Sequence, residues 1–157
     1  MPIVHLLRAV TVSLNVFGVR FARDNGLHPT DLRAIIGLLD AERAGVTATA
    51  GWLGESLQLN SASVTALVDR LERLGHVRRE RDATDRRRVL LSVTLEAKEL
   101  GWAFFGPLMA RMLETMGGYR DDELAVIHRF LAQTAAVVAE CASTDRLPRP
   151  APGTGAR

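Results

Sequence analysis

Residues 60–93, which read NSASVTALVDRLERLGHVRRERDATDRRRVLLSV, decide the fold that we predict for this chain of 157 residues. Asn60 can cap a helix with its side-chain oxygen, and Gly75 suits the left-handed residue that follows one. Between them, apolar residues recur every three or four positions, as on the buried face of a helix. These residues are Val64, Leu67, Val68, Leu71 and Leu74. We therefore predict one helix between Asn60 and Gly75.

A shorter helix is predicted immediately before this one. Thr49 is a suitable N-cap, and Leu53 and Leu57 fall on one side of the helix that would follow. Gly54 has no Cβ and would let another helix approach closely. Because only three residues separate the two helices, they form a candidate helix-turn-helix.

After Gly75 the period of the apolar pattern changes from nearly four to two, which indicates β-strands over 77–81 and 89–93. We expect these strands to pair as a hairpin. The connecting residues 82–87, DATDRR, are polar and charged, so they have no core to join and must project into solvent or onto a partner.

Four more helices are predicted around this region. The first spans 3–24 and is terminated by the Asn-Gly pair at 25–26. The second begins at Pro29, which suits a first helical position. A fifth helix, capped by Thr94, has more apolar residues than one face can hold, and a sixth begins at Asp121. In chain order, the apolar positions of these four helices are Leu6, Val10, Leu14, Phe17 and Phe21; Leu32, Ile35, Ile36 and Leu39; Leu100, Phe104, Phe105, Leu108, Met109, Met112, Leu113 and Met116; and Leu124, Ile127, Leu131, Thr134 and Val138.

The composition, 47% hydrophobic and 24% charged, is typical of a globular protein. Only the tail over 144–157, rich in Pro, Gly and Ala, is predicted to be disordered. His5 and Arg8 interrupt the apolar N-terminus, and no segment reaches about 18 uninterrupted apolar residues, so we expect a soluble cytoplasmic protein. The single cysteine, Cys141, excludes an internal disulfide and fits a reducing compartment.

Basic residues cluster in one region of the chain. The net charge is only +2, which excludes a uniformly basic surface. Residues 70–88, however, hold eight arginines against four acids. Any attraction for phosphate must therefore come from this region.

The predicted helix and hairpin offer two elements that could bind DNA. The outer face of the helix carries short side chains that can enter a major groove, namely Ser61, Ala62, Ser63, Thr65 and Ala66. Arg86 and Arg87 at the hairpin tip can reach the adjacent minor groove, and Asp85 can orient a neighbouring arginine through a bidentate pair. Taken separately, the helix face can be an ordinary solvated surface and the arginine run a charged edge that prevents strand aggregation. Together they favour DNA binding.

The order of elements and the residues over 49–94 resemble the MarR family of bacterial winged-helix regulators. The family's helix pattern V-T-x-L-V-D-R-L-E-x-x-G is present as VTALVDRLERLG over 64–75, and its wing pattern D-x-x-D-R-R as DATDRR over 82–87. The resemblance implies a mainly α fold with a small β-hairpin wing, in which a winged helix-turn-helix domain occupies 27–94. Helices over 1–26 and 95–143 would form a dimer interface, which accounts for the unusually apolar fifth helix.

The resemblance also implies a set of DNA-binding residues. By position, these are Ser61, Ser63, Thr65, Arg70, Arg86 and Arg87. Arg87 would enter the minor groove with Asp85 bracing it, and Arg86 would contact a phosphate. Ala66 stands where many members carry an arginine that contacts bases. A greater share of specificity would therefore fall on the wing and on DNA shape.

Many members of the family bind small aromatic or phenolic acids between the DNA-binding lobe and the dimer helices. Residues that could line such a pocket here are His5, Arg8, Arg20, His28 and Trp52, with structural roles as the alternative. Members that sense peroxides use a reactive cysteine on the first helix, which this chain lacks. Thiol sensing of that type is therefore not expected.

The expected function is that of a homodimeric, sequence-specific DNA-binding transcription regulator. We expect a repressor, with an activator as the alternative, on a near-palindromic operator with half-sites about one helical turn apart, released by a small aromatic effector. The alternative is a winged helix used for protein contacts without specific DNA binding. An enzyme is not expected, because no nucleophile with a base, phosphate loop or metal-ligand spacing occurs, and for the same reason no cofactor or metal site is predicted.

Overall fold

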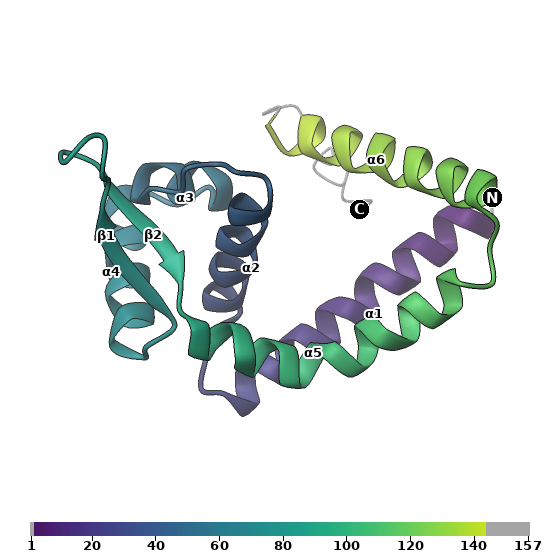
Figure 1. Cartoon of the computed structure of the whole chain (residues 1–157), viewed down its shortest axis with the longest axis horizontal. Helices are drawn as coiled ribbons and strands as arrows, with labels where there is room; N and C mark the ends of the chain where they lie inside the picture. Colours follow the sequence, from purple (N-terminus) through teal and green to yellow (C-terminus); the bar gives the residue numbers. More distant parts are fainter. Residues whose placement is uncertain (1, 144–157) are drawn as a thin grey trace, which may run out of the picture. The chain divides into compact units, whose positions relative to one another are not determined.

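The computed structural model describes residues 2–143, so the disorder predicted for 144–157 lies outside the described residues. Over residues 2–143 the chain forms six helices and a two-stranded antiparallel hairpin (Figure 1), which confirms the mainly helical winged-helix prediction. In chain order the elements are α1 (Pro2–Asp24), α2 (Pro29–Arg43), α3 (Ala50–Leu57), α4 (Ser61–Arg73), β1 (Val77–Arg81), β2 (Val89–Val93), α5 (Leu95–Met116) and α6 (Asp121–Ser143).

The chain divides into two compact units between Gly106 and Pro107, inside α5. The first unit holds α1 to β2 and the first half of α5, and the second holds the rest of α5 and α6. The domain boundaries predicted after residues 26 and 94 stay predictions. Residues near the end of α1 and the start of α5 are buried in the core of the first unit.

The predicted helix ends are confirmed in detail. The side-chain oxygens of Thr49, Asn60 and Thr94 each accept a hydrogen bond from the backbone N–H three residues later, which is the geometry of an N-cap. Pro29 is the first residue of α2, and Gly75 follows α4 with a φ of 76°. Local chemistry therefore sets where these helices begin and end.

The core of the first unit gathers residues from α1 to α4, from both strands and from the start of α5. A Cβ at residue 54 would lie 3.1 Å from both the carbonyl oxygen of Leu59 and Cγ2 of Val64. The predicted close approach at Gly54 is thus confirmed, and it lets α3 and α4 pack as a helix-turn-helix. The largest apolar side chains that are fully buried are Leu53, Val68, Leu71 and Val77.

Two predictions of burial are wrong. Ile36 is 45% exposed, because the inner face of α2 runs through Ile35 and Leu38 instead, and a neighbour in a helix is turned by roughly 100°. Leu74 is also 45% exposed. It is the C-cap residue, beyond the last turn of α4, where no other element covers it.

Four phenylalanines join the end of α1 to the first half of α5. Phe17 and Phe21 lie against Phe104 and Phe105, with ring centroids 4.7 to 5.5 Å apart. Aromatic pairs at such distances contribute roughly 0.5–1.5 kcal/mol each beyond the area that they bury. These ring contacts join the last turns of α1 to the first half of α5 within the first unit.

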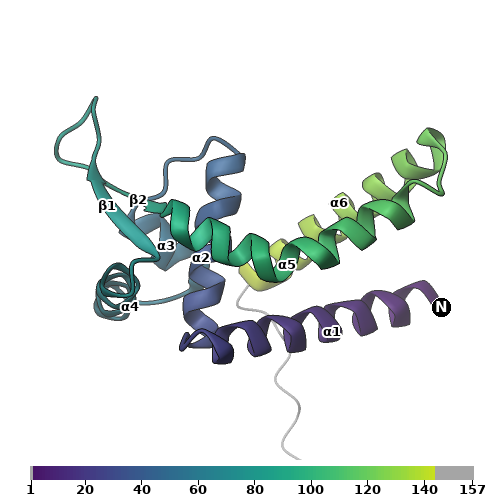
Figure 2. The same cartoon turned by 60° about the horizontal axis from the view of Figure 1, so that its bottom comes forward.

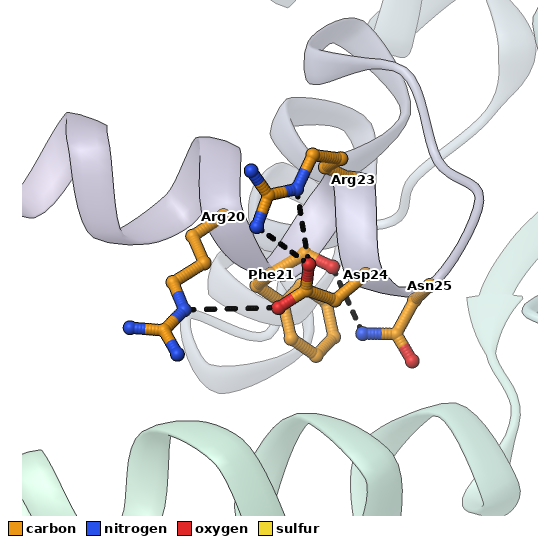
Figure 3. Close-up of polar contacts among 5 residues, drawn as sticks. All are labelled: Arg20, Phe21, Arg23, Asp24 and Asn25. Atoms are coloured by element: carbon orange, nitrogen blue, oxygen red, sulfur yellow. Dashed lines mark hydrogen bonds and ion pairs between the residues drawn. The ribbon is translucent and has the colours of Figure 1, made fainter.

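Polar side chains form hydrogen bonds and ion pairs at the C-terminal end of α1 (Figure 3). The Asn25 amide donates a hydrogen bond of 2.8 Å to the carbonyl oxygen of Phe21. The Asp24 carboxylate accepts hydrogen bonds from Arg23 and lies 3.7 Å from Nε of Arg20. These contacts hold the turn that carries Phe21 into the core.

The hairpin pairs as predicted, with a register that runs from Val77 opposite Val93 to Arg81 opposite Val89. A further connection was not predicted. The N–H of Leu91 donates to the carbonyl oxygen of Ala48 at 2.9 Å, which ties the segment before α3 to β2. The helix-turn-helix and the hairpin are therefore parts of one body.

Candidate nucleic-acid interface

The outer face of α4 is open and carries only small side chains. All five residues predicted for this face are exposed, namely Ser61, Ala62, Ser63, Thr65 and Ala66. The Thr65 hydroxyl donates to the carbonyl oxygen of Ser61 at 2.9 Å, so its free lone pairs can accept but its proton is already engaged. The face offers short hydrogen-bonding groups and no steric obstruction, as a helix entering a major groove requires.

The loop between the strands extends beyond them (Figure 2) and is built around Asp82. One carboxylate oxygen of Asp82 accepts hydrogen bonds from the N–H and the hydroxyl of Thr84, at 2.8 and 2.6 Å. The other oxygen lies 3.7 Å from Nη1 of Arg88, and the backbone N–H of Asp82 donates to the Arg88 carbonyl. This side chain therefore holds the loop closed, a role that the sequence analysis did not assign.

Asp85 supports the wing, but not through the bidentate arginine pair that was predicted. Its carboxylate accepts a hydrogen bond of 3.0 Å from the backbone N–H of Arg87, and its carbonyl oxygen accepts from the N–H of Arg88. The support acts on the backbone because a carboxylate two residues before an N–H closes a tight turn easily. Arg86 and Arg87 are left at the exposed tip.

The contacts of Asp82 predict an acid response of the wing. The Thr84 hydroxyl, followed by the Thr84 N–H, holds the pKa of Asp82 below its ordinary value of 3.8. Because the folded-state pKa is the lower one, these contacts stabilise the fold above the unfolded-state pKa and are lost as the pH falls through the folded-state value. An NMR titration should place the Asp82 midpoint below 3.8, and Thr84→Val should raise it. A wild-type midpoint at or above the ordinary value would contradict this assignment.

The eight arginines over 70–88 fall into two groups. The arginines that form ion pairs with carboxylates of the same chain are Arg70, Arg78, Arg79 and Arg88. The others have exposed side chains whose guanidinium groups make no hydrogen bond or ion pair with any residue that the structure describes, and they are Arg73, Arg81, Arg86 and Arg87. Half of the local positive charge is therefore neutralised internally, and the hairpin tip holds two of the free cations.

Arg70, predicted as a DNA contact, has an internal partner. Its guanidinium donates from Nε and Nη2 to the carboxylate of Asp31 in the first turn of α2. Asp31 is completely buried, whereas the Arg70 side chain is 32% exposed. The hydrogen bonds to Asp31 raise the pKa of Arg70, which stays charged.

A second ion-pair group joins α4 to the wing. Arg79 on β1 binds Asp69 through Nη2 at 2.6 Å and Glu72 through Nη1. Sequence reasoning missed this group, although the three-residue spacing of the two acids on one helix face was a usable signal. Arg79 therefore neutralises two carboxylates on the face of α4 that lies beside β1.

The five residues predicted for a ligand pocket are not gathered in one chain. His5 and Arg20 lie fifteen residues apart on α1, about 22 Å along a helix, so one small ligand cannot touch both. Arg20 instead pairs with Asp24. His28 is the exposed N-cap residue of α2, Trp52 packs against the core from α3, and Arg8 is exposed near the start of α1.

Two helices expose long apolar faces. By length and composition, α1 and the Asp121–Ala142 part of α6 could each cross a membrane, and only 6% and 0% of these spans is buried. The sequence predicted no span, because charged or polar residues interrupt each apolar run. Length and hydropathy do not distinguish a membrane helix from one that packs against another protein chain. In either case these faces require an apolar partner.

The small-residue helix, its tight turn and the arginine-tipped hairpin define a winged helix-turn-helix protein. The chain belongs to the MarR family of transcription regulators. The MarR family model matches residues 25–88. The protein described as uncharacterized HTH-type transcriptional regulator YcgE, from Bacillus subtilis (strain 168), is 36% identical over 137 residues, which cover 87% of this chain and 86% of the relative.

Solved structures of MepR from S. aureus share the fold. A mutant MepR from a multidrug resistant clinical isolate superposes with a TM-score of 0.70 at 17% identity, over 85% of this chain and 95% of that chain. The MepR–DNA complex gives a TM-score of 0.56 at 17% identity, over 85% and 98%. MepR bound to ethidium bromide gives 0.58 at 17% identity, over 85% and 94%.

Proposed function

We propose that this regulator is a cytoplasmic homodimer that binds double-stranded DNA sequence-specifically. In this proposal α4 enters the major groove of each half-site and the wing reaches the flanking minor groove. A two-fold symmetric dimer requires a near-palindromic operator with half-sites about one helical turn apart. Binding at a promoter would exclude polymerase, which makes repression the expected outcome.

One observation carries the proposal. Arg86 and Arg87 are held at the tip of a loop that Asp82 and Asp85 stabilise through the backbone, and their guanidinium groups have no partner among residues 2–143. An unpaired arginine pair beside an open, small-residue helix face has the charge and the geometry to bind a duplex. The DNA complex of MepR, which has the same fold, supports DNA as the partner.

The dimer is supported by the apolar faces of α1 and α6, which a second copy of the chain would cover. MepR binds ethidium, a planar aromatic cation, and a small aromatic ligand is the class that we propose here. Because His5 and Arg20 of one chain cannot contact the same small ligand, such a site would use at most one of them from that chain, together with residues of other helices.

A salt titration with wing variants tests DNA binding directly. Arg87→Ala should lose about 1–3 kcal/mol of affinity for a duplex selected by the wild type, mainly at A·T-rich flanks. Arg86→Ala should reduce the slope of log affinity against log salt by about one, because one fewer phosphate contact releases fewer counterions. Both would be measured by fluorescence anisotropy.

Arg78→Ala is the matched control, because Arg78 lies in the same hairpin but is paired with Glu80. It should leave the slope nearly unchanged. If the wild type binds no duplex, or binds with a flat salt response, the protein-contact alternative replaces this proposal.

A further inference from the structure

We infer that Arg70 is a positioning residue: its fork on the buried carboxylate of Asp31 sets the rotation of the recognition helix α4 about its own axis. This inference rests on the proposed function, since it concerns how α4 is presented to DNA. It replaces direct DNA contact as the role of Arg70.

The anchor on α2 is rigid. Asp31 is completely buried and lies in the first turn of α2, where its Oδ2 also accepts a hydrogen bond of 2.9 Å from the N–H of His28. A buried carboxylate without a partner is strongly disfavoured, so Asp31 requires the guanidinium in this place. Its orientation is set by the backbone at the start of α2.

The guanidinium group of Arg70 restricts the orientation of the ion pair. Nε of Arg70 lies 3.1 Å from each carboxylate oxygen, and Nη2 also donates to Oδ1. A planar fork on a carboxylate tolerates little rotation, unlike the single-point contact that a lysine ammonium would make. The pair therefore fixes the direction of the Arg70 side chain relative to α2.

Helical geometry links this contact to the face proposed to meet DNA. Arg70 follows Ser63 by seven residues, about two turns, so the two residues lie on nearly the same side of α4. Any rotation of α4 that turned Ser63 toward or away from a groove would also swing Arg70 off Asp31. The ion pair thus fixes the rotation of α4 about its axis, and with it the direction in which Ser61, Ser63 and Thr65 face the bases.

Two variants that keep the net charge test this role. Arg70→Lys retains the cation but loses the fork, and the double variant Asp31→Asn with Arg70→Gln replaces the ion pair by a neutral pair. Each is measured against a duplex selected by the wild type and a scrambled duplex of equal length, over a range of salt. Circular dichroism melting confirms that each variant is folded at the temperature used.

For both variants we expect affinity for the selected duplex to fall by at least about tenfold, roughly the loss caused by one mismatched base pair. Affinity for the scrambled duplex and the salt slope should stay at the wild-type values. Equal losses on both duplexes would show a merely structural role, and a slope reduced by about one in the double variant alone would show a phosphate contact. Unchanged affinity would also overturn the inference, whereas a wild type that binds neither duplex would overturn the proposed function itself.

Discussion

Replacing Leu131 with glutamate is expected to leave the protein monomeric and to weaken binding to a two-half-site operator by roughly 100-fold or more. Leu131 lies on the apolar face of α6 and is 48% exposed in a single chain. No side chain of α6 that the structure describes is buried. In a two-fold interface the substitution places one carboxylate from each subunit in an apolar contact, where unpaired charge is strongly disfavoured.

The loss of DNA affinity follows from the loss of the dimer. Two linked recognition helices bind two half-sites with an effective concentration that separate monomers do not reach at micromolar protein. Light scattering after size exclusion would report the mass, and anisotropy the affinity. Gln133→Glu adds the same charge about 200° around α6, and it should leave both unchanged. A Leu131→Glu variant that stays dimeric would remove α6 from the interface.

Leu71→Ala is expected to lower the free energy of unfolding by about 2–5 kcal/mol. Leu71 is completely enclosed where α4 packs into the core, and the cavity left by alanine adds to the lost transfer energy. Typical domains are stable by only about 5–15 kcal/mol, so much of the margin of the DNA-binding unit would be lost. Urea denaturation at one fixed protein concentration measures the change, because the proposed dimer would make the stability depend on protein concentration.

Leu74→Ala is the control for this core substitution. Leu74 is three residues further along the same chain segment and 45% exposed, so its truncation should cost well under half as much. Equal costs at the two positions would mean that the core does not lie where the burial of Leu71 places it. Wing residues such as Arg86 should tolerate alanine without a change in stability, since they contact solvent.

Much of the local structure was predictable because its causes are local. Asn60, Thr94 and Gly75 end or begin helices through hydrogen bonds and dihedral angles that involve residues at most a few positions away. The alternation after Gly75 predicted the hairpin for the same reason. The small outer face of α4 also followed from helical spacing alone.

Other features depended on elements far apart in sequence. The family resemblance implied that Arg70 contacts DNA, yet its side chain reaches Asp31, 39 residues earlier. Asp85 was correctly placed at the wing but bonds to backbone and not to a guanidinium. Periodicity could not reveal either outcome, because a charged side chain takes the partner that the fold brings within reach.

The sequence by itself determined the helix-turn-helix, the arginine-tipped hairpin and the excess of apolar surface on the flanking helices. These follow from spacing, capping and composition, which need no knowledge of distant neighbours. Only the tertiary structure decided which of the eight arginines over 70–88 are neutralised and which stay free. Ion pairing depends on distances of a few ångströms between separate elements, and such distances exist only once the core has packed.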